Sequence, residues 1–204
     1  MKKEEKTELT KKKILQAAMQ EFGSKGYQGA SLNAIVLESG LPKGLLYHNF
    51  KNKDALYLAC VERCFQALTE CLRKADIGDD LERYMQVRLH FFKEHTEEAG
   101  IFFDVVLQPP EGLLEELRAA KKEFDEINFE LYRCILDSIQ LREGVTYEEA
   151  MSYFTLLQEM FNSSFSRRSS PNISLTDKIE LHERDLPKLM DFILYGIARR
   201  NKEC

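Results

Sequence analysis

The chain has 204 residues, of which 44% are hydrophobic and 31% are charged, a composition typical of a globular protein with one large or two small domains. It contains no apolar run near the roughly 18 residues that a membrane-spanning helix needs. The amino-terminal sequence MKKEEKTELTKKK also lacks the apolar stretch of a signal peptide. We therefore expect a cytoplasmic protein with no membrane partner.

Charge is distributed unevenly along the chain. Residues 1–60 contain ten lysines and six acidic residues, a balance of +4, so the remainder carries −9 of the net −5. A nucleic-acid-binding part needs positive charge, whereas a part that does not touch nucleic acid does not. The distribution favours a basic amino-terminal head on an acidic body.

Helical periodicity runs through the whole chain, and no segment has a convincing strand alternation, so we expect an all-α fold. The first helix has an apolar face and is closed by Gly23 and Gly26. That face consists of Ile14, Ala18 and Phe22, with Leu15 beside them.

Two short helices and a longer one follow. Ser31 is a good N-cap for the second helix, Gly40 suits the left-handed position after it, and Pro42 suits the first turn of the third. Asn52 can cap a helix from about Lys53 to Ala75. Two short helices joined by a glycine-containing turn predict a helix-turn-helix.

The rest of the chain predicts a helical body. The expected segments are a helix at about 81–95, a short apolar segment at 101–107, a long helix at about 113–139, a helix at about 147–168 opened by a Thr146–Glu149 capping box, a loop at 169–178 and a last helix at about 185–200.

The last two of these helices are apolar around most of their circumference. The first carries Met151, Tyr153, Phe154, Leu156, Leu157, Met160, Phe161 and Phe165, and the second carries Leu189, Met190, Phe192, Ile193, Leu194, Tyr195 and Ile197. A surface helix of a monomer needs only one apolar stripe. Burial inside a large monomer is one explanation, and a homodimer formed through a four-helix contact is the one we favour.

The cysteines do not suggest a disulfide framework, because their number is odd and no CxxC pair occurs. They are Cys60, Cys64, Cys71, Cys134 and Cys204. The first three share one helical face and are expected to be small buried hydrophobic residues, with a thiol sensor or a metal site as alternatives. The histidines form no i, i+4 pair, so no metal site is expected.

No motif of an enzyme is present. A di-iron bundle needs two Glu-x-x-His pairs, and the chain has none; GxSxG, HExxH and a glycine-rich phosphate loop are also missing. We expect no catalytic residues and no cofactor.

The segment ILQAAMQEFGSKGYQGASLNAIVLESGLPKGLLYHNFKNKDAL, residues 14–56, resembles the DNA-binding signature of the TetR family of transcriptional regulators, most specifically at 44–53. The resemblance implies an all-α protein with a three-helix helix-turn-helix DNA-binding domain at 1–52. A helical ligand-binding and dimerisation domain would follow at 53–204, with 53–75 as the connecting helix.

The resemblance also implies a set of DNA-contacting residues: Ser31, Lys43, Gly44, Leu45, Tyr47, His48, Asn49 and Lys53. Ser31 would hold a phosphate at the start of its helix, and Lys43 could donate to guanine while Gly44 lets the backbone approach.

Three further positions of this set have their own readings. Tyr47 would reach a phosphate, although its ring could instead fill the interface with the next helix. Lys53 would grip the DNA backbone. Leu45 departs from the family, which more often has a small hydroxyl residue there; it could pack on a thymine methyl or beside Leu41 and Phe50.

The implied function is a dimeric repressor that leaves a palindromic double-stranded operator when a small-molecule inducer binds its body. Polar residues on otherwise apolar faces, together with two aromatic walls, are the candidate ligand contacts. They are Arg88, Phe103, Phe124, Asn128 and Gln158. A helix-turn-helix that binds a partner protein instead of DNA is the alternative, and the positive charge of residues 1–60 argues against it.

Overall fold

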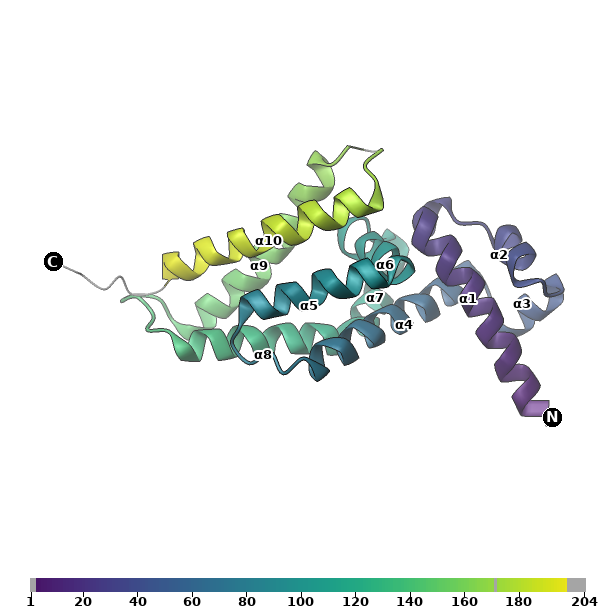
Figure 1. The fold of residues 1–204 in the computed structure, drawn as a ribbon, viewed down its shortest axis with the longest axis horizontal. Coiled ribbons are helices and arrows are strands. Elements are labelled where there is room, and N and C mark those ends of the chain that lie inside the picture. Colours follow the sequence, from purple (N-terminus) through teal and green to yellow (C-terminus); the bar gives the residue numbers. More distant parts are fainter. Residues whose placement is uncertain (1–2, 171, 198–204) are drawn as a thin grey trace. The chain divides into compact units, whose positions relative to one another are not determined.

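The computed structural model describes residues 3–170 and 172–197, and Figure 1 shows their fold. Within those ranges all regular structure is helical, which confirms the all-α class. The helices are α1 (Lys3–Gly29), α2 (Leu32–Ser39), α3 (Lys43–Asn49), α4 (Lys53–Lys74), α5 (Leu81–Glu94), α6 (Thr96–Leu107), the 3₁₀ helix η1 (Glu111–Leu113), α7 (Leu114–Ala120), α8 (Lys122–Ser138), α9 (Tyr147–Arg168) and α10 (Leu175–Ile197).

The chain forms two compact units. The first unit comprises the described parts of residues 1–67 together with 95–122, and the second comprises those of 68–94 and 123–204. Helix α4 continues from one unit into the other. The expected division into a DNA-binding domain at 1–52 and a ligand-binding and dimerisation domain at 53–204 concerns function, not compactness, and it stays a prediction.

The core of the first unit forms where α1 packs against α6 and α2. The expected apolar face of α1 is buried, since Ile14, Ala18 and Phe22 are fully inaccessible to solvent. The expectation that Gly23 helps to end this helix is wrong, because α1 continues through it as far as Gly26, which has φ 65° and ψ 177°. Gly23 instead lies where α6 comes close: a Cβ atom there would be 2.6 Å from the Glu97 carbonyl oxygen.

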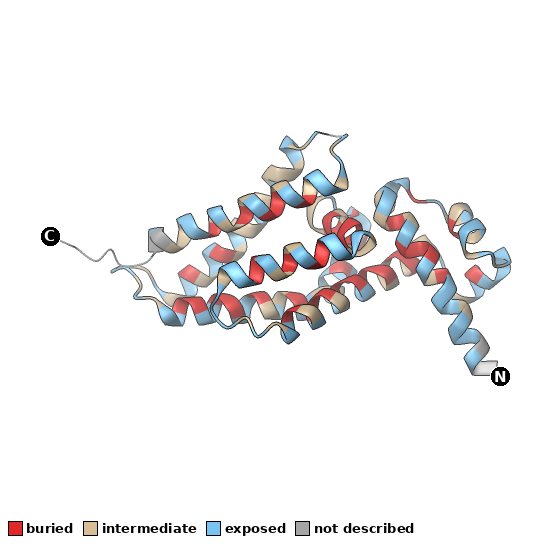
Figure 2. Ribbon diagram, viewed as in Figure 1, coloured by how far each residue is buried: buried red, intermediate tan, exposed pale blue. Residues whose placement is uncertain are grey.

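The short helices begin and end as the sequence indicates. Ser31 is the N-cap residue of α2, and Gly40 adopts the left-handed conformation with φ 64°. Pro42 directly precedes α3, and the Asn52 side chain accepts a hydrogen bond of 2.9 Å from the backbone N–H of Ala55, which caps α4. Figure 2 shows exposed and intermediate positions predominating in α2 and α3.

The second unit is a helical bundle in which α10 packs against α5 and α9. The Thr146–Glu149 capping box opens α9 as expected. The expected long helix at 113–139 is wrong, because the backbone at Lys121 leaves the helical conformation (φ −96°, ψ 3°) and separates α7 from α8.

The expected loop at 169–178 is also too long. Ser174 caps α10: its hydroxyl accepts a hydrogen bond of 3.0 Å from the Asp177 N–H, so the helix begins at Leu175 rather than near Asp185. The helix also runs through Pro187, although proline is more usual in the first turn of a helix. Residues 198–200 and the side chains of Tyr195 and Ile197 lie outside the described part of the structure.

The cysteines of α4 behave largely as expected. Cys60 and Cys64 are fully buried, Cys71 is intermediate and Cys134 is exposed, while Cys204 lies outside the described residues. Burial raises the pKa of the Cys60 thiol to about 12. Among the described residues, no helix is long and apolar enough to cross a membrane, and no cluster of metal-ligating side chains occurs.

Candidate nucleic-acid interface

Helix α3 has one buried side and one open side. Leu46 is 2% exposed and, with Phe50 just after the helix, anchors α3 in the first unit. The open side carries Lys43, Gly44, Leu45, Tyr47 and His48, all exposed, and Asn49 is intermediate. The structure therefore presents the predicted contact residues of α3 together, on the side that its own core does not use.

Lys43 and Tyr47 form one local group with α2. The Lys43 ammonium donates to the Asn33 side-chain oxygen at 3.1 Å and lies 5.9 Å from the centroid of the Tyr47 ring. Tyr47 is 48% exposed, so its ring does not fill the interface with the next helix. Nearly half of the residue is thus open to solvent.

Gly44 is the informative small residue of this surface. A Cβ atom at Gly44 would meet no atom within 4 Å, and no positive φ occurs there. The packing of the described chain therefore does not require glycine at this position. Glycine would be required here only by a partner that approaches the backbone from outside the chain.

Two predicted contacts already have partners inside the chain. The Asn49 amide donates to the Leu45 carbonyl oxygen at 2.7 Å. The backbone N–H of Ser31 donates to Glu21 Oε1 at 2.9 Å, and Lys25 also pairs with Glu21, at 2.8 Å. Partial burial opposes ionisation of Glu21, but the hydrogen bonds from Lys25 and Ser31 outweigh it and lower its pKa. A carboxylate thus stands at the start of α2, where we expected a phosphate to bind.

Lys53 is held at the start of α4 by an aromatic ring. Its ammonium lies 4.7 Å from the centroid of the Tyr27 ring, within the range of a cation–π contact. The Tyr27 hydroxyl donates to Asp54, and this hydrogen bond, with partial burial, raises the pKa of Tyr27 to about 12. Sequence reasoning did not identify Tyr27, because an isolated tyrosine has no motif that distinguishes it.

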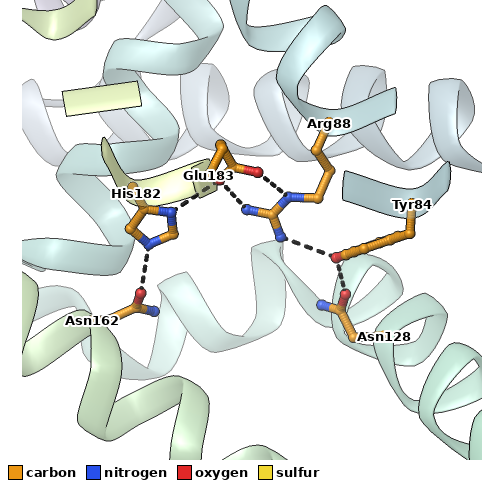
Figure 3. A network of polar contacts seen from close by, with 6 residues as sticks. All are labelled: Tyr84, Arg88, Asn128, Asn162, His182 and Glu183. Carbon is orange, nitrogen blue, oxygen red and sulfur yellow. Dashed lines mark hydrogen bonds and ion pairs between the residues drawn. The ribbon is translucent and has the colours of Figure 1, made fainter. Parts of the chain in front are cut away.

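The second unit brings three predicted ligand contacts together around a buried ion pair, which Figure 3 shows. Arg88 of α5 is 1% exposed and donates to both carboxylate oxygens of Glu183 on α10, at 3.0 and 2.8 Å. It also donates to the Tyr84 hydroxyl at 3.0 Å, and that hydroxyl donates to the Asn128 oxygen. The guanidinium carbon lies 5.9 Å from the centroid of the Phe124 ring.

The network continues from Glu183 to α9. Nδ1 of His182 lies 2.9 Å from Glu183 and Nε2 lies 2.9 Å from the Asn162 oxygen. A carboxylate only accepts hydrogen bonds, so Nδ1 carries the hydrogen.

Burial determines how the two titratable groups of this network ionise. It lowers the pKa of His182 despite the neighbouring Glu183. For Glu183, burial alone would raise the pKa, but the charge of Arg88 and the hydrogen bond from His182 outweigh it and lower the pKa. The network therefore favours a neutral imidazole beside an ionised carboxylate. Because Nδ1 of that imidazole is the donor, Nε2 is an acceptor, and the Asn162 amide must turn its NH₂ group toward it to complete the hydrogen bond.

The other two predicted ligand contacts lie elsewhere. Phe103 is on α6 in the first unit, and Gln158 is half-buried on α9. His182 and Glu183 were not predicted, because residues 179–184 were not expected to be helical; an acidic residue on the buried face of α10 would have been the signal.

The hydroxyls of Thr69 and Tyr132 are buried and have no hydrogen-bond partner among the described residues.

An apolar surface remains uncovered on α9 and α10. Tyr153, Leu156 and Met160 of α9 are 48%, 49% and 60% exposed, and Phe192 of α10 is 73% exposed. These residues line open grooves between the two helices. The structure thus places much of the surplus apolar area, predicted from the sequence, on one side of the bundle.

Comparisons with known proteins agree with this arrangement. The amino-terminal family model of bacterial regulatory proteins of the tetR family matches residues 14–60, and a tetracyclin-repressor-like carboxy-terminal domain model matches residues 75–194. IcaR of Staphylococcus epidermidis, named as a negative transcriptional regulator of the biofilm operon icaADBC, is 29% identical over 123 residues. That match covers 60% of this chain and 65% of IcaR, slightly less than two thirds of the relative's length.

Solved structures share the fold at low sequence identity. A tetR-family regulator from Shewanella sp. PV-4 has a TM-score of 0.62 at 19% identity and covers 94% of this chain and 99% of its own. The regulator FadR from Bacillus subtilis, solved with stearoyl-CoA, has a TM-score of 0.63 at 16% identity, with 91% and 98% coverage.

Proposed function

Because this chain belongs to the TetR family of bacterial regulatory proteins, we propose that it is a dimeric transcriptional repressor. It binds a palindromic DNA operator through its helix-turn-helix and is released by a small-molecule inducer.

The observation that carries DNA binding is the open side of α3. A lysine, a tyrosine hydroxyl and a glycine with empty space above it lie on one short helix whose opposite side is anchored by Leu46 and Phe50. Such a helix fits the major groove, where Lys43 can donate to the O6 and N7 acceptors of guanine. The +4 balance of residues 1–60 supplies the sequence-independent attraction to phosphates.

A homodimer is supported by the exposed apolar side chains of α9 and α10. A second copy that presents the same face would form a four-helix contact and remove them from water. Two recognition helices, one helical turn apart, about 34–36 Å, would then read the two halves of a palindrome.

Inducer binding is proposed for the second unit. Arg88, Asn128 and Phe124 combine charge, an amide and an aromatic wall, and the buried Tyr132 hydroxyl, which has no partner among the described residues, adds a polar group next to them. FadR of B. subtilis, which has the same fold, was solved with stearoyl-CoA. Inducer and operator would weaken each other's binding by the same factor. An inducer that binds tightly without lowering operator affinity would contradict the release mechanism.

DNA binding is tested by comparing three variants on operator and random duplexes by fluorescence anisotropy. Lys53→Ala and Tyr47→Phe remove phosphate contacts and should weaken both duplexes about equally. Lys43→Ala removes a base contact and should weaken the operator by about 1–3 kcal/mol more than random DNA. Equal losses on both duplexes for Lys43→Ala would refute its role in base recognition.

A further inference from the structure

Helix α1 contains a kink that α6 completes. At Gly26 the backbone adopts φ 65° and ψ 177°, so the helical hydrogen-bonding pattern is interrupted there. The next backbone N–H, that of Tyr27, donates to Asp104 Oδ2 of α6 at 2.8 Å. The carboxylate of a helix 77 residues away in the chain thus satisfies a donor that the kink exposes.

The same carboxylate oxygen accepts a second hydrogen bond, from the Tyr57 hydroxyl of α4 at 2.6 Å. Tyr57 is fully buried, and hydrogen bonds to an ionised acceptor are the strong ones. A Cβ atom at Gly26 would lie 2.5 Å from Asp104 Oδ1, so glycine leaves the room that the carboxylate occupies. Asp104 therefore joins α1, α4 and α6 at one point.

The backbones of α1 and α6 are also in close contact. A Cβ atom on Gly100 would collide with the Gly23 carbonyl oxygen, and one on Gly23 would lie 2.6 Å from the Glu97 carbonyl oxygen. This contact fixes the register of α6 on α1. Asp104, one turn after Gly100, is consequently held at the height of the kink.

From the kink, contacts continue to a proposed DNA-contacting residue. The Tyr27 N–H donates a hydrogen bond to Asp104, and the Tyr27 hydroxyl donates one to Asp54. The Lys53 ammonium lies 4.7 Å from the centroid of the Tyr27 ring. The sequence division assigns Asp104 to residues 53–204, yet in the structure it belongs to the compact unit that holds α1, α2 and α3.

We propose that Asp104 is a positioning residue for DNA binding: by holding the Tyr27 N–H and the Tyr57 hydroxyl, it sets the place from which Lys53 grips the DNA backbone. The inference rests on the proposed DNA-binding function. It makes α6 a structural part of the DNA-binding unit, so the geometry of the contact between Lys53 and a DNA phosphate depends on the position of α6 against α1.

The first test compares Asp104→Asn with Asp79→Asn. Both changes remove one negative charge, but Asp79 is exposed in the turn before α5, so it controls for the general effect of charge on DNA affinity. We expect Asp104→Asn to weaken binding to operator and random duplexes about tenfold, equivalent to about 1.4 kcal/mol. Asp79→Asn should change neither affinity by more than about twofold.

A double-mutant cycle with Lys53→Ala separates positioning from loss of folded protein. If Asp104 acts through Lys53, Asp104→Asn in the Lys53→Ala background should cost less than about twofold. A purely structural defect would cost the same factor in both backgrounds, and that result would overturn the proposal.

A second variant protects the test from a failure to fold. Tyr57→Phe keeps the buried ring and removes only the hydroxyl that Asp104 accepts. It should weaken DNA binding at least about threefold at a temperature where circular dichroism shows it fully folded. If wild-type protein binds no duplex, the proposed function itself fails. If wild type binds and folded Asp104→Asn and Tyr57→Phe bind equally well, the positioning role alone fails.

Discussion

Gly44 gives the clearest test at the scale of single residues. Because a Cβ atom there would meet nothing within 4 Å, Gly44→Ala should leave thermal stability unchanged or slightly raised. In a major groove the same methyl group would meet the DNA, so operator affinity should fall about tenfold or more. Melting by circular dichroism and anisotropy titrations measure the two effects. Unchanged operator affinity would mean that no partner approaches this backbone.

The buried ion pair of the second unit has a different residue-scale consequence. Glu183→Gln leaves the Arg88 guanidinium charged and 1% exposed without its carboxylate. Removing one partner of such a pair costs about 3–5 kcal/mol, which urea unfolding would detect. Glu115→Gln is the control, because the Arg118–Glu115 pair is exposed and contributes little. A loss no greater than that of the control would show that Arg88 finds solvent or another partner.

The same network predicts the sign of the pH dependence of stability. The pKa of folded His182 is below its ordinary value of 6.5 and that of folded Glu183 is below 4.5. In each case the unfolded chain takes up the proton at a higher pH than the folded one, so acid favours unfolding. Stability should decline below about pH 6.5 and more steeply below about pH 4.5, and His182→Gln should remove the first decline. A free energy of unfolding of the wild type that increases as the pH falls from 6.5 to 5 would contradict this assignment.

At the scale of elements, local signals placed the short helices well. Ser31, Gly40 and Asn52 act through their own backbone or side chain within a few residues, and their positions agree with the structure. The late start expected for α10 overlooked a local signal, the Ser174 cap, whereas the error at Gly23 arose because a distant element decides the outcome. Gly23 looks like a helix end in sequence, but it is a contact point for α6, which begins 73 residues later.

The candidate site divides in the same way. The exposed residues of α3 could be predicted, because a short motif determines both their spacing and their side of the helix. The partners of Glu21 and Tyr27 could not, since Ser31 and Asp104 reach them only through the tertiary fold. Likewise, the polar network joins four helices, α5, α8, α9 and α10. Of its residues, the sequence suggested Arg88 and Asn128 alone.

The crossing of α1 and α6 carries an element-scale prediction. Gly100→Ala would place its methyl group against the Gly23 carbonyl oxygen, so the helices must move apart and stability should fall by about 1–3 kcal/mol. Gly112→Ala is the matched control, because its Cβ would meet nothing within 4 Å. Urea unfolding of both variants measures the difference. Equal stabilities would show that the two backbones can separate at no cost.

For the whole molecule, the exposed face of α9 and α10 predicts the oligomeric state. Phe192→Glu places a charge on the most exposed aromatic residue of that face, 73% accessible, and should weaken a dimer by at least about 100-fold. Phe129→Glu, on an exposed position of α8, is the control and should leave the dimer intact. Sedimentation equilibrium distinguishes the two. A wild-type chain that sediments as a monomer at micromolar concentration would refute the homodimer.

Sequence recognition by α3 is tested by selecting bound sequences from a random duplex pool at low ionic strength, with wild-type protein and Lys43→Ala compared in parallel. We expect the wild type to enrich an inverted repeat whose half-sites are centred about one helical turn apart, and Lys43→Ala to enrich it less sharply. A wild-type protein that enriches no sequence, or one whose preference Lys43→Ala leaves unaltered, would contradict the claim that the open side of α3 reads DNA.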